Sequence, residues 1–376
     1  MQKNEYSRLA TPIKSRGRIY KEKSSLLRSP YQRDRDRIIH STAFRRLKHK
    51  TQVFVNTTDD HFRTRITHSL EVSQIARTLA KIFGLNEDLC ETLSLAHDLG
   101  HPPFGHAGEK ILNEVMYKYG GFDHNIQTLR IVTLLEKKYY NFKGLNLSIE
   151  TLDGLIKHNG PVKDCSKLNR ILGKNFFKKK INFKLNSSLE AQIASISDDI
   201  AYNSHDLEDG LKSNLFKLSH LKDIPELNKI ITTHRKKLKK YSIDLVIRQI
   251  IRDVINKMVR DVIITTKKNL RLYRVKNLND IYRTQSQIVT FSDNMKKFDE
   301  QIKKFLRRKM YFNNKVNSRT NYGRKVISKL FTKIKKKPKQ FINIRKYNNS
   351  NIERVISDYI AGMTDRYAIN LYNKLK

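Results

Sequence analysis

Residues 96–109 read AHDLGHPPFGHAGE and gather three histidines, an aspartate, a glutamate and a Pro-Pro pair in one short stretch. The whole chain contains only 12 histidines, so this density is a first sign of a site. Leu89 and Leu93 precede the stretch on one face of a predicted helix, which the Pro-Pro pair then breaks. The adjacent His97 and Asp98 are therefore expected to project from a buried helix end into a cleft.

An imidazole beside a carboxylate suits a divalent metal ion of borderline-to-hard character. Two other predicted helices offer further ligands: His68 in RTRITHSLEV, and an aspartate in ISDDIAYNSHD. Helical periodicity alone cannot choose between Asp198 and Asp199. A lone histidine near a helix is more often structural, and a His-Asp pair alone is a weak signal. The ordered set on successive helices is stronger, since two nitrogens and two carboxylates leave positions open for water and substrate.

The rest of the chain is predicted to be mainly α-helical, because apolar residues recur at helical spacing and alternating strand patterns are scarce. With 376 residues, 38% of them hydrophobic, it has enough apolar surface for a folded core. The sequence contains no run of about 18 apolar residues, so no membrane span is predicted. The two cysteines do not form a metal-type pair and are expected to be reduced thiols in a cytoplasmic protein.

Composition divides the chain into three predicted segments. Residues 1–60 are basic, and the apolar residues mixed into their arginine-rich stretches indicate a segment that packs on the core. Residues 61–210 are the least lysine-rich part and carry the histidine and aspartate motifs, so they are predicted to form the metal-binding domain. Residues 211–376 are predicted to be a helical region with basic loops and a final helix pair or long helix.

The formal net charge of +40 predicts attraction to polyanions such as nucleic acid, nucleotides or an acidic membrane surface. Much of the excess is lysine, accompanied by many asparagines and isoleucines, which a compositionally biased genome also produces. The charge is therefore weak support for an anionic ligand and does not identify one.

Five segments, in order, resemble the motifs of one family. They are RTRITHSLEVSQIAR (63–77), AHDLGHPPFGHAGE (96–109), GGFDHN (120–125), LEAQIASISDDIAYNSHD (189–206) and VISDYIAGMTDRYA (355–368). Together they resemble the dGTP triphosphohydrolase-like family of the HD-domain superfamily, and the resemblance runs from about residue 28 to the C-terminus. It implies an all-α fold in which the HD metal-dependent phosphohydrolase domain occupies residues 61–210, with extra helices on either side.

The resemblance implies four metal ligands: His68, His97, Asp98 and Asp198. The family pattern has a tyrosine four residues after the last ligand, and this selects Asp198 over its neighbour Asp199. Mn²⁺ or Mg²⁺ fits the nitrogen and oxygen ligands, with Fe, Ni or Zn as alternatives.

Four residues match the family's catalytic residues: His101, His106, Glu109 and His124. Glu109 would orient a water molecule or an imidazole, and His106 would protonate the leaving oxygen. The alternative is that one or two of the four only hydrogen-bond around the site, most readily His101.

Six residues match the family's nucleotide-binding residues: Arg46, Gln52, Arg65, Tyr202, Asp206 and Tyr311. Arg65 would bind phosphate, and Tyr311 would pack on the deoxyribose. Tyr202 and Asp206 share one helical face with the metal-binding aspartate. For these two the alternatives are helix packing and a solvated surface, and for Arg46 a surface ion pair.

The resemblance implies metal-dependent hydrolysis of deoxynucleoside triphosphates, with dGTP as the first candidate, to deoxynucleoside and tripolyphosphate. It also implies a homo-oligomer, with a hexamer as one form, and a nucleotide or single-stranded DNA effector. Two alternatives stay open: an HD phosphohydrolase for another nucleotide, and a nucleic-acid-binding or regulatory protein with a vestigial site. The complete metal and catalytic set argues against a vestigial site.

Overall fold

The fold is all-α, as predicted, in the part of the chain that the computed structural model describes, namely residues 7–52, 63–173, 177, 180–343 and 351–375. Pairing of the β type occurs among the described residues only as three isolated bridges. The α-helices in chain order are α1 (Pro30–Ile39), α2 (Thr42–Arg46), α3 (Arg65–Ile82), α4 (Glu87–Ala96), α5 (Gly105–Val115), α6 (His124–Arg130), α7 (Ile149–Ile156), α8 (Ser166–Leu172), α9 (Leu189–Lys212), α10 (Pro225–His234), α11 (Ile243–Leu272), α12 (Leu278–Arg283), α13 (Asp293–Leu306), α14 (Asn314–Lys336), α15 (Ile352–Ala361) and α16 (Asp365–Lys374).

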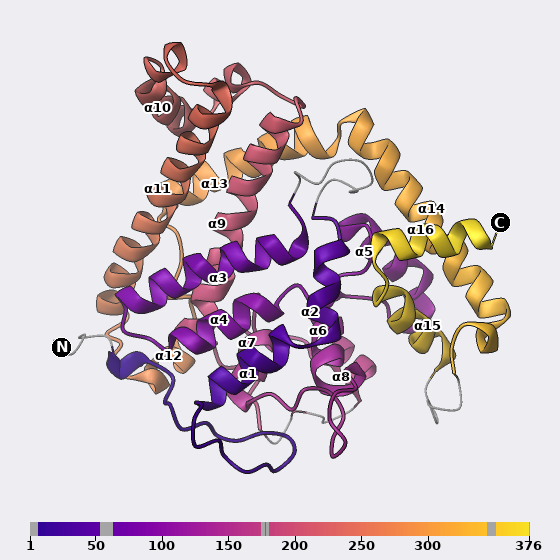
Figure 1. Ribbon diagram of the computed structural model, residues 1–376. Coiled ribbons are helices and arrows are strands. Elements are labelled where there is room, and N and C mark those ends of the chain that lie inside the picture. The colour runs from indigo at the N-terminus through magenta and orange to yellow at the C-terminus, as the bar shows by residue number, and fades with distance from the viewer. Residues whose placement is uncertain (1–6, 53–62, 174–176, 178–179, 344–350, 376) are drawn as a thin grey trace.

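The centre of the fold is formed by α3, α4 and α9, which all pack on one another (Figure 1). Helix α1 covers α4, and α11 covers α9. The apolar residues at helical spacing in α3 are buried, as expected for a helix that packs on two others: Val72, Ile75, Ala76 and Leu79. Asn86 caps α4 by accepting a hydrogen bond from the backbone N–H of Leu89. This packing fixes the three helices that carry or directly precede the histidine and aspartate motifs.

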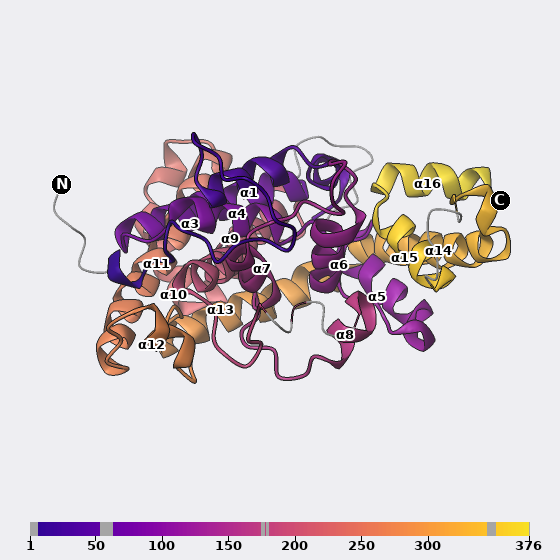
Figure 2. The same cartoon turned by 90° about the horizontal axis from the view of Figure 1, so that it is seen from below.

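Three buried apolar clusters fill the fold. The first lies among α3, α9, α11 and α13, and the second among α1, α4, α7 and the residues after α6. The third joins α5 to α14, α15 and α16. Figure 2 shows that α14, α15 and α16 form one end of the molecule, while α10, α11 and α12 lie at the other. The C-terminal helices thus share a core with α5, the helix that begins inside the 96–109 stretch.

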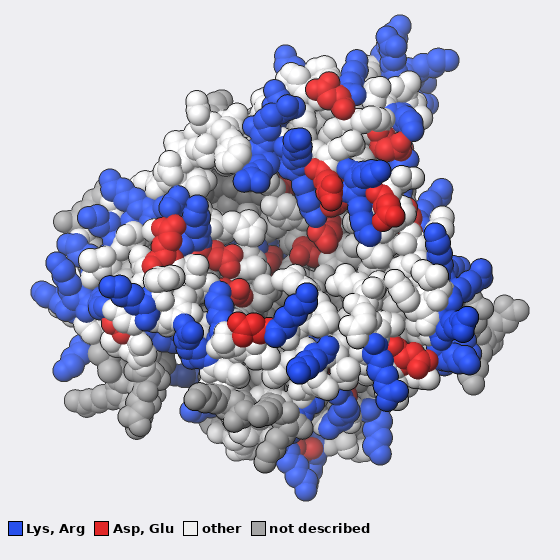
Figure 3. All heavy atoms as spheres, turned by 180° about the vertical axis from the view of Figure 1, so that it is seen from behind, with Lys and Arg blue, Asp and Glu red and all other residues white. Residues whose placement is uncertain are grey.

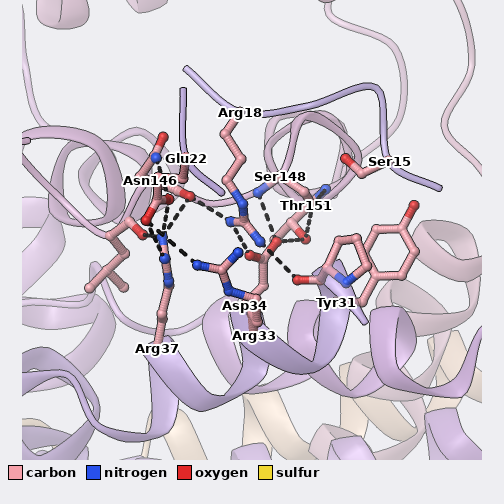
Figure 4. Close-up of polar contacts among 12 residues, drawn as sticks. Ser15, Arg18, Glu22, Tyr31, Arg33, Asp34, Arg37, Asn146, Ser148 and Thr151 are labelled. Carbon is pink, nitrogen blue, oxygen red and sulfur yellow. Dashed lines mark hydrogen bonds and ion pairs between the residues drawn. The ribbon is translucent and has the colours of Figure 1, made fainter. Parts of the chain in front are cut away.

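Ion pairs hold the N-terminal residues on the core (Figure 4). Arg18 pairs with Asp34 of α1, and Arg37 of α1 pairs with Glu22 at 2.8 Å. The second oxygen of Asp34 accepts from the backbone N–H of Ser148, the residue that caps α7, at 2.8 Å. Arginines of this basic segment are therefore used inside the fold, where they join it to α1 and α7.

The division of the chain into three segments stays a prediction. Its first boundary, between residues 60 and 61, lies outside the described residues. Its second, between residues 210 and 211, falls in the last turn of α9.

Basic side chains are displayed to solvent. On the face seen in Figure 3, Lys and Arg side chains line the outer edges, and acidic side chains are interspersed nearer the middle. Such a surface raises the local concentration of anions. None of the described helices is long and apolar enough to cross a membrane.

Candidate metal centre and active site

Three helices bring two histidines and an aspartate to one point. His68 lies near the start of α3, His97 directly follows α4, and Asp198 lies within α9. His68 Nε2 is 2.9 Å from Asp198 Oδ1, and His97 Nε2 is 3.5 Å from the same oxygen. One ligand atom from each residue lies within 4.8 Å of the others, a spacing that one metal ion can bridge. We call these three residues the metal cluster.

His97 is arranged to bind an ion through Nε2. Its Nδ1 donates to the carbonyl oxygen of Ser94 at 2.6 Å, so Nε2 is the nitrogen left to bind a metal ion once its proton is displaced. That Nε2 atom is buried and has no hydrogen-bond partner among the described residues. A buried nitrogen of this kind is costly unless something satisfies it, and a metal ion would do so. Burial lowers the pKa of His97, but the carboxylates of Asp98 and Asp198 outweigh burial and raise it to about 9.

Asp98, the fourth predicted ligand, lies next to the metal cluster and is also bound to other residues. Its Oδ2 accepts from Arg65 Nη1 at 2.8 Å. Its Oδ1 lies 2.9 Å from His101 Nδ1 and 3.5 Å from His97 Nε2. Burial raises the pKa of Asp98, but Arg65 and the two histidines outweigh burial and hold it well below its usual range. The carboxylate is therefore charged, and Oδ1 faces both the metal cluster and His101.

The two adjacent aspartates of α9 have different surroundings. Asp198 reaches the histidines of the metal cluster, whereas the side chain of Asp199 is 45% exposed and pairs with Lys303 of α13 at 2.9 Å. The structure therefore brings Asp198, and not Asp199, to the candidate metal centre.

The predicted catalytic residues form a group beside Asp98. Glu109 of α5 accepts from the backbone N–H of His124 at 2.9 Å and lies 2.8 Å from its Nδ1. His106 Nδ1 is 3.6 Å from the other oxygen of Glu109. The ring of His101 lies close to the other two histidines, with its centroid 3.9 Å from His124 and 5.7 Å from His106. We call these four residues the glutamate–histidine group.

Within this group Glu109 is charged and His106 is exposed. Burial raises the pKa of Glu109, but its contacts with His106 and His124 outweigh burial and hold it below its usual range. Glu109 is therefore a carboxylate at neutral pH. The side chain of His106 is 64% exposed, so it can reach a bound molecule.

A left-handed turn places the start of α5 beside Arg65. Phe104 has a φ of 63°, and Gly105, the first residue of the helix, has a φ of 55°. A Cβ atom on Gly105 would lie 3.2 Å from Arg65 Nη2, so both the backbone and the close approach favour glycine. The Pro-Pro pair, which is predicted to break the helix before it, lies in the connection between α4 and α5.

Tyr202, Asp206 and Tyr311 meet further along α9. The hydroxyl of Tyr311 lies 2.7 Å from that of Tyr202 and donates to Asp206. Tyr311 ends a π-helical turn, η7 (Arg307–Tyr311), that follows α13. Burial raises the pKa of Asp206 to about 7, against the effect of the hydrogen bond from Tyr311. The three side chains together can donate to and accept from a sugar hydroxyl.

Replacing Asp206 by asparagine is expected to remove one pH-dependent part of the stability. An aspartate whose folded-state pKa is raised to about 7 contributes stability that is present below about pH 4 and is lost as the pH rises through 7. The urea midpoint of the wild type should therefore fall between about pH 5 and about pH 8, and that of Asp206→Asn should fall less. Burial also raises the pKa of Asp209, to about 6, so some slope remains in the variant. Equal slopes in both proteins would contradict the assignment.

Arg46 and Gln52, two other residues predicted to contact the nucleoside or its phosphates, lie apart from Tyr202, Asp206 and Tyr311. Arg46, at the end of α2, is exposed and lines a cleft of about 1490 Å³ with residues of α6, α15 and the 136–143 segment. No described residue of the metal cluster lines this cleft. Gln52 is buried, its backbone carbonyl faces Gly105, and its Oε1 has no hydrogen-bond partner among the described residues. Gln52 thus lies beside the turn before α5, while Arg46 opens onto a separate cleft.

Two histidines and a glutamate that were not predicted from the sequence also lie around the metal cluster. His158 Nε2 lies 3.6 Å from Asp198 Oδ2. His205 Nδ1 lies 3.3 Å from His68 Nδ1, and its Nε2 lies 2.9 Å from Glu71. His205 comes seven residues after Asp198 on the same helix, so helical periodicity could have found it. His158 follows α7 outside every motif segment, and no local signal in the sequence marks it.

A helical core that gathers histidine, His-Asp and aspartate motifs at one point is typical of the HD class of phosphohydrolases. Residues 65–203 match the HD domain family model, and residues 289–374 match the phosphohydrolase-associated domain. The second match covers α14, α15 and α16, which share a core with α5.

Curated relatives match nearly the whole chain. It is 60% identical over 368 residues to a deoxyguanosinetriphosphate triphosphohydrolase-like protein of Pelagibacter ubique, covering 98% of this chain and 99% of that protein. Proteins of the same name from Bartonella quintana and Rickettsia rickettsii are 46% and 43% identical, each over 97% of this chain and over 94% and 96% of their own lengths. The chain belongs to the deoxyguanosinetriphosphate triphosphohydrolase-like family and is a hydrolase of the HD class.

Proposed function

We propose that the protein hydrolyses deoxynucleoside triphosphates, with dGTP as the first candidate substrate, to deoxynucleoside and tripolyphosphate. The observation that carries the proposal is the contact between the metal cluster and the glutamate–histidine group. Asp98 Oδ1 approaches both His97 and His101, so a phosphate at the metal cluster would also lie within reach of proton-transferring side chains. The name shared by the relatives supports dGTP as the substrate.

The proposed cofactor is a divalent metal ion held by His68, His97, Asp98 and Asp198. Mn²⁺ or Mg²⁺ suits the mixed nitrogen and oxygen donors, and Fe, Ni or Zn are the alternatives. The donor set fits an ion because His97 Nε2 is buried without a hydrogen-bond partner among the described residues and faces two carboxylates. When bound, the ion would supply positive charge beside the phosphate and lower the pKa of a bound water molecule.

The side chains of the glutamate–histidine group would move the protons. Hydrolysis adds water to the α-phosphorus and breaks its bond to the 5′ oxygen. Glu109 is a carboxylate that is hydrogen-bonded to His124. It would orient the attacking water, or an imidazole that accepts the proton of that water. His106 would protonate the 5′ oxygen as it leaves. Arg65, whose buried Nε has no partner among the described residues, would offset charge on the phosphates.

The nucleoside would contact the remaining predicted residues. Tyr202, Asp206 and Tyr311 form one hydrogen-bonded set that would hold the deoxyribose. Gln52 would contact the sugar or base through its partnerless Oε1. Arg46 is proposed as a nucleotide contact from its motif match alone, because it lines the separate cleft.

We further propose a cytoplasmic homo-oligomer, with a hexamer as one form, that responds to a nucleotide or single-stranded DNA effector. The net charge of +40 favours a polyanionic effector. The cleft beside Arg46 has suitable chemistry, because Tyr139, Tyr140 and Phe142 line it and bases stack on aromatic rings. The same charge favours the second candidate function, nucleic-acid binding without turnover.

Product analysis tests the proposed function. Purified protein would be incubated with Mn²⁺ and dGTP, alone and with the other dNTPs, and the products separated by ion-exchange chromatography. We expect deoxyguanosine and tripolyphosphate. The products dGMP and pyrophosphate would keep the metal site but overturn the bond that is cleaved. No product from any mixture, despite bound metal, would favour another nucleotide substrate or the nucleic-acid-binding role.

A further inference from the structure

The carboxylate of Asp365 joins two segments that lie far from it in sequence. Asp365 is the first residue of α16 and is buried, with 5% of its surface exposed. Its Oδ1 accepts from the backbone N–H of Phe104 at 3.0 Å. Its Oδ2 accepts from the backbone N–H of Thr51 at 3.0 Å and from the Thr51 hydroxyl. Both oxygens therefore accept hydrogen bonds, and all three bonds come from Thr51 and Phe104, outside the C-terminal helices.

Lys50 makes a second connection between the same three segments. Its ammonium group is buried and donates to the backbone carbonyls of His101 at 2.6 Å and Ala361 at 2.8 Å. Burial lowers the pKa of Lys50 to about 7, and the nearby Asp365 carboxylate opposes that effect. Ala361 is the last residue of α15, so the two bonds of Lys50 together attach the end of that helix to the connection before α5.

Asp365 and Lys50 hold segments that lie next to the proposed reacting groups or contain them. The connection tied down at His101 and Phe104 leads directly into α5, which carries His106 and Glu109. The backbone carbonyl of Lys50 accepts from the N–H of Arg65 at 3.2 Å. A shift of either segment would therefore move the glutamate–histidine group relative to the metal cluster.

We propose that Asp365 is a positioning residue for the reaction, acting with Lys50 to hold the 101–106 segment at the distance from Arg65 that turnover requires. The residue lies in the phosphohydrolase-associated domain, whereas the residues it positions lie in or beside the HD domain. The inference rests on the proposed function for the identity of the reaction, whereas the positioning itself rests on the contacts of Asp365 and Lys50. Asp365 touches no ligand of the metal cluster, so its loss affects the alignment of the reacting groups and not metal binding. Misplacing reacting groups by about 1 Å lowers rates by about 10²-fold.

The test compares Asp365→Ala, Asp365→Asn and the control Tyr372→Leu. Tyr372 lies on the same helix and packs in the third apolar cluster, with its ring 6.3 Å from Tyr322 of α14. Its replacement loosens α16 and leaves the bonds from Asp365 to Phe104 and Thr51 in place. For each protein the melting temperature, Mn²⁺ affinity, kcat, KM and amide hydrogen exchange of residues 101–106 would be measured.

We expect Asp365→Ala to lower kcat by about tenfold or more, with KM and Mn²⁺ affinity within about threefold of the wild type. Amide exchange in residues 101–106 should accelerate. Asp365→Asn should recover part of kcat, since its amide oxygen still accepts one of the bonds. Tyr372→Leu should lower the melting temperature and leave kcat unchanged.

Two results would overturn the proposal: unchanged exchange of residues 101–106 in Asp365→Ala, or equal losses of kcat in Asp365→Ala and Tyr372→Leu. If Asp365→Ala does not fold, the same comparison is made with Asp365→Asn. A wild type that hydrolyses no dNTP would reject the proposed function, but not the positioning role. Exchange and Mn²⁺ affinity would then decide that role without turnover.

Discussion

Replacing Asp198 by alanine is expected to abolish metal binding and turnover together. His68 Nε2 and His97 Nε2 both approach Oδ1 of this carboxylate, at 2.9 and 3.5 Å. Its removal takes away one ligand and much of the negative charge that holds a cation between the two imidazoles. Mn²⁺ binding would be measured by isothermal titration calorimetry on metal-free protein, and turnover with dGTP by product chromatography.

Asp199→Ala is the matched control, since it removes the same side chain from the next position of the same helix. Asp199 pairs with Lys303 at the surface, away from the histidines of the metal cluster. The control should bind Mn²⁺ and turn over substrate as the wild type does. Full metal binding by Asp198→Ala, or equal losses in the two variants, would refute Asp198 as a ligand.

Replacing Glu109 by glutamine should leave metal and nucleotide binding intact and lower turnover by about 10²- to 10⁴-fold. Glutamine keeps the shape of the side chain and one acceptor oxygen, but it loses the negative charge. In the wild type Glu109 is ionised at neutral pH, because the contacts with His106 and His124 outweigh burial and keep its pKa below the usual range. The measurements are kcat, Mn²⁺ affinity and the affinity for a non-hydrolysable dGTP analogue.

Glu114→Gln controls for the loss of a carboxylate from the same helix. Glu114 is 45% exposed and pairs with Arg324 at 3.3 Å on the surface of α5 and α14. This control should keep wild-type turnover. If Glu109→Gln loses bound metal along with activity, Glu109 belongs with the metal ligands and not with the proton-transferring residues.

Sequence reasoning predicts the parts of the site that are encoded locally. The helical fold follows from apolar spacing, and the His97-Asp98 pair is marked by the buried helix before it and the prolines after it. The choice between Asp198 and Asp199 lies beyond periodicity, because adjacent residues of a helix differ by only about 100° in direction. The family motif made that choice, and the structure has Asp198 facing the histidines.

Contacts between distant segments could not be predicted in this way. Thr51 and Asp365 are 314 positions apart, and neither residue carries a local pattern that marks the bond between them. His158 approaches Asp198 only because α7 packs against α9. Arg46 lies within five residues of Lys50 in sequence, yet it opens onto the separate cleft because α2 ends there.

The bonds of Asp365 also set an order of events during synthesis. Translation delivers the HD domain first, and N-terminal parts of a chain begin to fold before the rest is made. The two segments that Asp365 joins must wait for a residue made more than 260 positions after Phe104. If the proposed roles hold, a nascent chain can bring His68, His97 and Asp198 together before the glutamate–histidine group is held in place, and we expect turnover to begin only when the C-terminal helices dock.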